Sequence, residues 1–447
     1  MKKLPQVSVF KVLRNTPQIL KNPLPFHEKN FKKHGDTFEI TTLGDGKLIF
    51  SRSPVLIKEV LQTNQKLFSK SRLQTKDLAK YIGHGLLTSE GEHWRTHRRM
   101  IQPKFYLKNL ESLIKIMHYA VKKELERITP GKEKDIFGLM GDVAFKVVAN
   151  SLFSSLDIGE PMKKLKAITE QNQIMLIKEM RQPYFKWWFK ASGQIQGALN
   201  ESKKAHKILN TLIEERLNSS QKSTDLLDML LESTYEDGSK MPRKQLIDEL
   251  LILFTAGYET TANALSFTLF FIAKNSDLQA QVFDEVSQIN ETSMQIEDLK
   301  KLSLTKSCIN EAMRLYPPVY IIDRVAKENV EIDDYKIKKD ALVLLSMYGL
   351  HRHHDFWKQP EDFIGSRFKD FDNKDYTKYY YPFGGGPRIC IGNAFATYEM
   401  IIVVAELVKN YEISTGMKNV EINPLISLKP KEVRLKFNKR KRPNSSA

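Results

Sequence analysis

The stretch FGGGPRICIG, residues 383–392, decides the fold of this 447-residue chain. Its Cys390 is one of only two cysteines. A cysteine thiolate is a strong axial ligand for haem iron, to which it donates electron density. Three consecutive glycines let a backbone pass close to a large flat group, and Arg388 could meet an anionic group such as a haem propionate. These residue types suit a haem site in which Cys390 is the iron ligand.

Other interpretations of this stretch fit the residues less well. A lone cysteine is more often a small buried hydrophobic residue. A phosphate-binding loop would need a following Gly-Lys-Ser/Thr, and the dinucleotide pattern Gly-x-Gly-x-x-Gly fails because Ile389 occupies its last position. Zinc is disfavoured because Cys308 and Cys390 have no second cysteine pair to join them.

Composition indicates a globular protein of the reducing cytoplasm. The chain is 41% hydrophobic and 28% charged, and two cysteines form no disulfide framework. No apolar stretch approaches the ~20 residues that span a bilayer, and the N-terminus lacks the features of a signal peptide. We therefore expect a non-anchored, bacterial-like cytoplasmic monomer.

The net charge of +17 admits three interpretations. The densest basic run, KPKEVRLKFNKRKRP at residues 429–443, could be solvated surface, a docking site for an acidic protein partner, or a nucleic-acid site. We expect no nucleic-acid binding because no motif for it is present.

The pattern along the chain predicts a mainly α fold with small, mostly antiparallel β sheets. Residues 36–50 alternate as a hairpin with its turn at 44–46, and helical spacing dominates 53–276. Residues 245–275 are apolar nearly all round, as in a buried central helix. Short strands return at 331–337 and 340–348, without the βαβ alternation of a dinucleotide-binding fold.

We therefore expect a single domain over residues 1–447. It would comprise a β-rich portion at about 36–52, a helical core at about 53–317, and C-terminal strands, cysteine loop and final helix at about 318–437.

The string AGYETT, residues 256–261, is unusual inside a buried helix. Ala256 and Gly257 leave the helix surface bare, so that a flat ligand could lie against it. Thr260 can bend the helix by bonding back to a carbonyl, and Glu259 with Thr260 forms an acid–alcohol pair suited to relaying protons. The alternative is a structural kink with a satisfied glutamate.

Two further helical strings carry paired charges or donors. In NEAMRLYPP, Glu311 and Arg314 share one helical face. In GEHWRTHRRM, Trp94 and Arg98 also share a face, next to His97, although such a helix could simply be basic surface. The string HRHHD, residues 351–355, lacks a metal-site spacing and is interpreted as structural.

Taken together, these strings resemble the cytochrome P-450 family. The pattern Phe-x-x-Gly-x-Arg-x-Cys-x-Gly, from Phe383 to Gly392, is similar to its cysteine loop, and AGYETT is similar to its oxygen-activation helix. Glu311 and Arg314 resemble its Glu-x-x-Arg pair, whose later arginine would be Arg367. Gly365 and Ser366 precede it where the family usually has Pro-Glu.

The resemblance implies haem b as cofactor and a role for each matched residue. Cys390 would bind the iron, Thr260 would stabilise bound dioxygen, and Glu259 would help relay protons. The implied cofactor contacts are Trp94, His97, Arg98, Ala256, Gly257, Arg324, Phe383 and Arg388. Glu311, Arg314 and Arg367 would be structural.

The reaction so implied is monooxygenation of a lipophilic substrate by O2. No flavin or iron–sulfur domain follows, so electrons would come from a ferredoxin or flavodoxin with its NAD(P)H-dependent reductase. The candidate pocket segments are residues 69–87, 182–189, 254–260 and 318–322, and a fatty acid or an isoprenoid is the expected substrate class. A non-catalytic haem-binding gas sensor remains the alternative.

Overall fold

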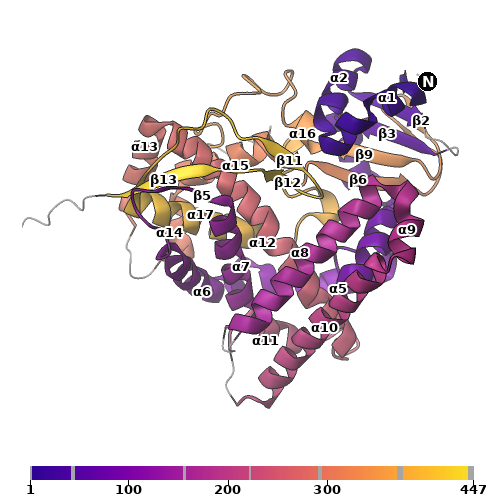
Figure 1. Ribbon diagram of the computed structural model, residues 1–447. Coiled ribbons are helices and arrows are strands. Elements are labelled where there is room, and N and C mark those ends of the chain that lie inside the picture. Colours follow the sequence, from indigo (N-terminus) through magenta and orange to yellow (C-terminus); the bar gives the residue numbers. More distant parts are fainter. Residues whose placement is uncertain are drawn as a thin grey trace, which may run out of the picture.

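The computed structural model describes residues 3–41, 46–154, 158–220, 223–289, 294–369 and 376–440. Helices fill most of the molecule, and the largest sheet lies to one side of them with α1 and α2 (Figure 1). The α-helices are α1 Val9–Lys21, α2 Leu24–His34, α3 Pro54–Lys58, α4 Ala79–Ile82, α5 Gly91–Ile101, α6 Leu107–Leu125, α7 Phe137–Phe153, α8 Gly159–Arg181, α9 Lys186–Ala191, α10 Gln194–Asn218, α11 Leu226–Leu231, α12 Arg243–Lys274, α13 Ser276–Ser287, α14 Ile296–Lys301, α15 Ser303–Leu315, α16 Met347–Leu350 and α17 Asn393–Asn410.

Shorter helical turns and strands complete the fold. The turns are the π-helical η1 Glu59–Thr63 and η3 Leu73–Leu78, and the 3-10 segments η2 Gln65–Leu67, η4 Gln102–Phe105, η5 Pro183–Phe185, η6 Tyr376–Lys378 and η7 Gly386–Arg388. The strands are β1 Gln6–Val7, β2 Thr37–Thr41, β3 Lys47–Ser51, β4 Phe68–Ser69, β5 Glu133–Asp135, β6 Ile321–Ala326, β7 Val330–Ile332, β8 Tyr335–Ile337, β9 Leu342–Ser346, β10 Tyr411–Ser414, β11 Ile422–Pro424, β12 Leu428–Pro430 and β13 Arg434–Lys439.

The main sheet has the strand order β1-β2-β3-β9-β6-β4. The predicted hairpin at 36–50 is present as antiparallel β2 and β3, in which Phe38 faces Phe50 and the two rings stack. Most of the predicted turn at 44–46 lies outside the described residues. The pairs β1–β2 and β3–β9 are parallel, and the other pairs in this sheet are antiparallel.

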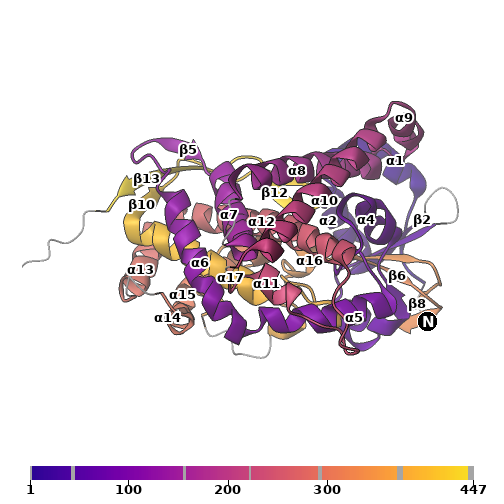
Figure 2. The ribbon, with the colours of Figure 1, turned by 90° about the horizontal axis from the view of Figure 1, so that it is seen from below.

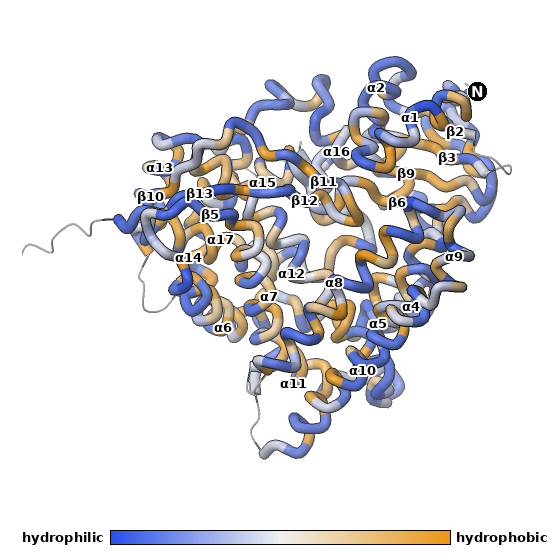
Figure 3. Tube along the Cα trace, in the orientation of Figure 1, coloured by the Kyte–Doolittle hydropathy of each residue, from blue (hydrophilic) through white to orange (hydrophobic). Residues whose placement is uncertain are grey.

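The predicted central helix is confirmed as α12, which begins at Arg243 and ends at Lys274. It packs against α7, α10, α15 and α17, and therefore buries side chains on nearly every face. Figure 3 shows hydrophobic colour along α7 and α17 as well, where they line the interior. Because these helices need no polar face, their sequences are apolar almost throughout.

The predicted division of the chain omitted some helices and strands that the structure contains. Helices α1 and α2 precede the β-rich portion, and four strands, β10 to β13, follow the final helix. Strand β5 lies inside the predicted helical core, where its residues Glu133–Asp135 pair with β13. All three β5 residues are exposed and none favours a strand, so partner pairing alone defines it.

Among the described residues, no helix is both long enough and apolar enough to cross a membrane.

Candidate active site

The cysteine loop is closed by hydrogen bonds from its own backbone and from α5. The amide of Cys390 donates to the carbonyl oxygen of Phe383 at 2.9 Å, and the amide of Ile389 donates to Gly386 at 3.1 Å. Arg98 Nη1 reaches from α5 to the Ile389 carbonyl oxygen at 2.8 Å. The loop therefore presents the thiol from a fixed position just before α17.

The Cys390 thiol lies within the protein and also retains accessible surface. Burial raises its pKa, while the Gly392 amide and the Arg98 guanidinium oppose that rise. The side chain is nevertheless exposed, and Ala256, in the middle of the central helix α12, is exposed as well.

The glycines of the loop serve contacts within the protein. Gly386 has φ +66°, and a Cβ there would collide with the carbonyl of Leu61 in η1. A Cβ at Gly385 would press on Tyr381 at 3.1 Å. At Gly385 and Gly386, the absence of a side chain therefore makes room for other parts of the chain, where we had expected it to make room for a flat cofactor.

Arg388 is the centre of a cluster of cations beside the loop. Its Nη2 pairs with Glu90 Oε2 at 2.5 Å, and its guanidinium lies 4.4 Å from the Trp94 ring centroid. Its Nη1 is buried and has no hydrogen-bond partner among the residues that the structure describes. A buried guanidinium nitrogen that lacks an acceptor indicates room for an anionic oxygen.

Two more buried cations face Arg388. Burial and the charge of Arg388 lower the pKa of Lys70 to about 7 and that of Arg324 to about 10. Lys70 Nζ donates to the carbonyl oxygens of residues 86, 87 and 89, and Arg324 Nη1 donates only to the carbonyl of its neighbour Asp323.

This cluster fits the dianionic edge of the haem that the sequence predicts. Glu90 lies near all three cations, Asp323 also acts on Arg324 and Glu249 on Lys70, yet the pKa of Lys70 and that of Arg324 stay below their usual values. Two propionates would supply the missing negative charge and an acceptor for Arg388 Nη1. The donor set and the accessible thiol therefore suit this cofactor.

His97 lies beside Glu249 of α12 and Tyr235. Its Nδ1 is 3.5 Å from Glu249 Oε1, and its Nε2 is 3.4 Å from the Tyr235 hydroxyl. Burial lowers its pKa to about 4, so the ring is neutral. Its Nδ1 is buried without a hydrogen-bond partner among the described residues, and its contact with the cofactor stays a prediction. Trp94 and Arg98, on the same helix α5, do join the loop and Arg388.

On α12, Ala256, Gly257 and Thr260 of AGYETT have different surroundings. Ala256 is exposed and Thr260 is partly exposed, with Thr260 Oγ1 donating to the Ala256 carbonyl at 2.9 Å. A Cβ at Gly257 would lie 3.0 Å from Val148 Cγ2 of α7. Gly257 therefore allows α12 and α7 to pack closely, and its contact with the cofactor stays a prediction.

Glu259 is held by residues from the C-terminal strands. Its Oε1 accepts a hydrogen bond from Ser427 Oγ at 2.5 Å, and its Oε2 pairs with Lys429 Nζ at 2.9 Å. Asn263, one turn further along α12, donates to the same serine oxygen at 3.0 Å. Lys429 was expected in a mainly solvated basic run, and the structure turns it inward to this carboxylate.

Behind the site, Glu311, Arg314 and Arg367 form a buried ion triad. The Glu311 carboxylate accepts from Arg314 Nε at 2.8 Å and from Arg367 Nε at 3.0 Å. Arg314 also donates to the carbonyl oxygens of His351 and Pro360 at 2.8 Å and 2.7 Å. The triad thus ties α15 to the segment that leads into the cysteine loop.

The HRHHD string, residues 351–355, makes its contacts within the protein. His353 Nε2 faces Asp36 Oδ1 at 2.9 Å, and its Nδ1 accepts from the Asp355 amide at 3.2 Å. Although His353, His354 and Asp355 lie close enough to hold an ion, both nitrogens of His353 are already used, which leaves none for a metal.

The predicted pocket segment 182–189 is largely on the outside of the protein. Its four large aromatic residues other than Phe189 are exposed, namely Tyr184, Phe185, Trp187 and Trp188. Phe189 alone is buried. The apolar composition of this segment was therefore misinterpreted as pocket lining.

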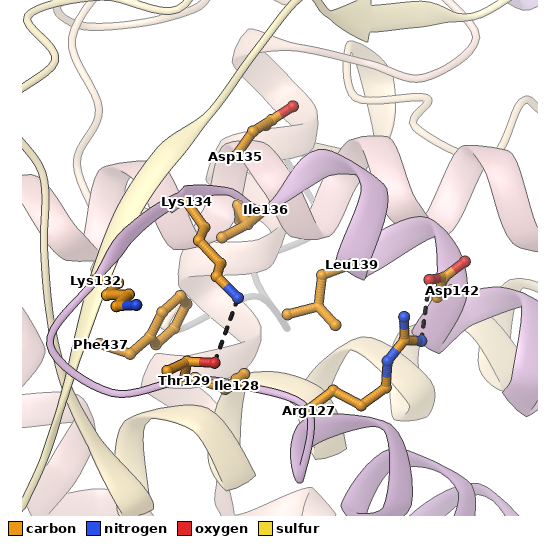
Figure 4. Close-up of a pocket in the computed structure, with 10 residues that line it drawn as sticks. All are labelled: Arg127, Ile128, Thr129, Lys132, Lys134, Asp135, Ile136, Leu139, Asp142 and Phe437. Carbon is orange, nitrogen blue, oxygen red and sulfur yellow. Dashed lines mark hydrogen bonds and ion pairs between the residues drawn. The ribbon is translucent and has the colours of Figure 1, made fainter.

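A separate surface cavity of about 170 Å³ lies between the end of α6, β5 and β13 (Figure 4). It is lined by Lys132, Lys134 and Asp142 among other residues, and its Arg127–Asp142 ion pair measures 3.1 Å. Its lining includes no residue of the cysteine loop or of α12, so it has no part in the proposed chemistry.

Sequence reasoning missed Lys70, Glu90, Ser427 and Lys429 as residues of the site. Each lies far along the chain from its partner, as Glu259 and Lys429 show. No spacing rule connects them, because strand pairing and helix packing bring them together only in the folded chain.

Comparisons with known proteins agree with this geometry. A sequence model described as cytochrome P450 matches residues 5–437. Among similar proteins, "Protein LUTEIN DEFICIENT 5, chloroplastic" of Arabidopsis thaliana is 29% identical, over 94% of this chain and 74% of the relative. "Putative cytochrome P450 132" of Mycobacterium tuberculosis is 29% identical over 78% of each chain, and "Cytokinin hydroxylase" of Arabidopsis thaliana is 27% identical over 91% and 81%.

Proposed function

This chain belongs to the cytochrome P450 family and is a haem-binding monooxygenase, and from that premise we propose that it inserts one oxygen atom of O2 into a lipophilic organic substrate with electrons from a separate redox protein. The observation that carries the proposal is the accessible Cys390 thiol beside an undercompensated cluster of buried cations.

The chain's own residues would divide the work as follows. Arg98, Arg324, Arg388 and Lys70 would bind and orient the cofactor's carboxylates, while Cys390 Sγ would ligate its iron. Bound haem supplies the redox chemistry that activates O2. At the distal side, Thr260 Oγ1 would hold a proton near the reacting oxygen.

Glu259 would act through Ser427 and Lys429. Ser427 Oγ and Lys429 Nζ fix both carboxylate oxygens of Glu259. Each carboxylate oxygen keeps a further acceptor site beside its contact, so the fixed carboxylate would take up and release protons toward Thr260.

The substrate proposed is a long-chain fatty acid or an isoprenoid. The candidate pocket segments 254–260 and 318–322 support this substrate class because they are largely apolar. One relative, the cytokinin hydroxylase of Arabidopsis thaliana, is named for a hydroxylation.

The electron donor proposed is an acidic ferredoxin or flavodoxin with its NAD(P)H-dependent reductase, in the cytoplasm. The net charge of +17 supports electrostatic steering of such a partner. A haem-binding gas sensor is disfavoured because it would not need the acid–alcohol pair.

The test compares the two cysteines. The reduced carbon monoxide complex of the wild-type protein should show the red-shifted Soret band of a thiolate haem. Cys390→Ser should abolish that band, whereas Cys308→Ser, which removes a buried thiol with only a long contact to the Gly365 carbonyl, should keep it. Loss of the band in both variants, or in neither, would refute the assignment of Cys390.

A second test addresses proton delivery with adjacent threonines. Thr260→Ala should divert electrons from product to peroxide. Thr261→Ala removes a similar hydroxyl, bonded to the Gly257 carbonyl at 2.9 Å, and should leave the coupling near the wild-type value. Equal coupling in wild type and Thr260→Ala would exclude the role of Thr260.

A further inference from the structure

The loop that joins α4 to α5, residues 83–90, is tied to α12 by two buried carboxylates. The His84 amide donates to Asp248 Oδ2 at 3.0 Å, and the Leu86 amide donates to Glu249 Oε2 at 3.0 Å. Both acidic side chains are buried, Glu249 completely. Hydrogen bonds from backbone amides to a carboxylate are among the stronger ones in proteins. The beginning of α12 therefore fixes the course of this loop.

Two glycines let loop 83–90 approach these carboxylates. A Cβ at Gly85 would lie 2.5 Å from Glu249 Oε2, and a Cβ at Gly83 would collide with the side chain of Asp248. Gly83 also has φ +83°, a conformation that favours glycine. The loop is thus fitted to the two carboxylates at both points of contact.

Further hydrogen bonds hold the same loop. Gln245, one turn before Glu249 on α12, donates through Nε2 to the His84 carbonyl oxygen at 2.7 Å and to Glu249 Oε1 at 3.0 Å. Within the loop, Thr88 Oγ1 donates to the Gly83 carbonyl oxygen at 2.7 Å. The backbone of the loop is therefore fixed both from α12 and from within.

The carbonyl groups of the loop hold Lys70. The Lys70 ammonium donates to the carbonyl oxygens of Leu86, Leu87 and Ser89 at 2.8, 2.9 and 3.1 Å. Lys70 is one of the cations that would meet the carboxylates of the cofactor, and it lies close enough to Arg388 to feel its charge. The position of this ammonium in the cation cluster thus depends on the course of the loop.

The same loop carries the end of the candidate pocket segment 69–87. The side chain of Leu87 is 37% exposed, whereas those of Leu86 and Thr88 on either side are buried. Figure 2 shows α4 and α5, the two helices that the loop joins, together on the right-hand side of the molecule, and α4 packs against α10 and α12. A shift of the loop would move a residue of the candidate pocket together with the Lys70 ammonium.

We propose that Asp248 and Glu249 are positioning residues of this enzyme, because they fix the backbone of loop 83–90. Through that backbone they fix Lys70 toward the cofactor and Leu87 in the candidate pocket. The inference rests on the proposed function, since haem and substrate are what these two residues would meet. The competing explanation is that the two carboxylates only offset the charge of Lys70, without any need for a hydrogen bond to the loop.

The test separates the hydrogen bond from the charge at Glu249. Glu249→Leu removes the acceptor and keeps a side chain of similar size, whereas Glu249→Gln removes the charge and keeps an acceptor oxygen. Hydrogen exchange over residues 83–90 of the holoprotein, read by mass spectrometry, should be at least about tenfold faster in Glu249→Leu than in wild type. In Glu249→Gln it should stay within about threefold of wild type.

Transfer of haem from the holoprotein to apomyoglobin gives the second readout. Glu249→Leu should release haem at least about threefold faster than wild type, because the Lys70 ammonium would lose its fixed position, and Glu249→Gln should restore the wild-type rate. The matched control is Glu285→Leu. Glu285 accepts the amides of Leu304 and Thr305 at 2.7 and 2.8 Å, so its loss should speed exchange at the start of α15 and leave loop 83–90 and haem release unchanged.

Gly85→Ala keeps the test decisive if Glu249→Leu does not fold. It leaves both carboxylates intact, and its Cβ would push the loop away from Glu249, so loop exchange and haem release should rise together. Wild-type loop exchange in this variant would overturn the proposal.

Three further results would also overturn it. The first is wild-type loop exchange in Glu249→Leu. The second is an equal change in Glu249→Leu and Glu249→Gln, which would assign the effect to charge. The third is faster loop exchange with unchanged haem release, which would separate the loop from the cofactor. Loop exchange does not depend on the chemistry, so a wild-type protein without the thiolate Soret band would contradict the proposed function and leave the loop measurement valid.

Discussion

Removing the negative charge of Glu311 should destabilise this protein more than almost any other single change of equal size. The Glu311 side chain is fully buried and accepts hydrogen bonds from Arg314, from Arg367 and from the Ile364 amide at 3.0 Å. Glu311→Gln keeps the shape of the side chain, leaves two guanidiniums without a counter-charge, and turns an amide donor toward other donors.

The expected loss follows from the cost of breaking a buried ion pair, about 3–5 kcal/mol. For a chain of 447 residues, the entropy of unfolding is about 0.9 kcal/mol per degree. The midpoint of thermal unfolding should therefore fall by about 3–5 °C.

Differential scanning calorimetry at one fixed scan rate would measure this change. The matched control is Glu297→Gln, whose carboxylate is 62% exposed and lies 3.7 Å from Lys300; its midpoint should move by about half a degree or less. Arg367→Gln should give an intermediate loss, because Glu311 would keep Arg314. A Glu311→Gln midpoint within about 1 °C of wild type would refute the electrostatic reasoning.

Other perturbations should have the following results. Burial lowers the pKa of His351 to about 3, so unfolding takes up a proton below about pH 6.5. The free energy of unfolding should therefore fall by about 1.4 kcal/mol per pH unit as the pH drops toward 3. The urea midpoint of His351→Gln should depend less on pH than that of wild type, and an unchanged dependence would contradict this. Lys429→Gln removes the cation on Glu259 and should lower the product formed per electron while haem content stays the same; an unchanged ratio would exclude Lys429 from proton delivery. Glu179→Gln weakens the contacts of 2.5 Å to Lys80 and Tyr81 and should speed hydrogen exchange in α4, as read by mass spectrometry; equal exchange would show that these contacts do not hold α4. Reduction by an acidic redox protein should slow steeply with added salt, and a salt-independent rate would argue against steering.

The sequence was sufficient wherever the determining interactions are local. The central helix α12 was predicted within two residues because its apolar residues recur on every face. The hairpin of β2 and β3 was predicted because alternation over a few residues defines both strands. The prediction of Cys390 as the thiol ligand likewise depends on one contiguous stretch, residues 383–392.

Tertiary structure alone decided which distant residues meet. Lys429 belongs to the basic run at 429–443, whose role the sequence left open, and β12 carries it to Glu259. His97, adjacent in sequence to a face with Trp94 and Arg98, turns instead toward Glu249. The aromatic residues of 182–189 have the composition of a pocket, and only packing showed that most of them point outward. Local sequence fixes the period and capping of an element, whereas burial and charge pairing depend on which elements pack together, and that is a property of the whole chain.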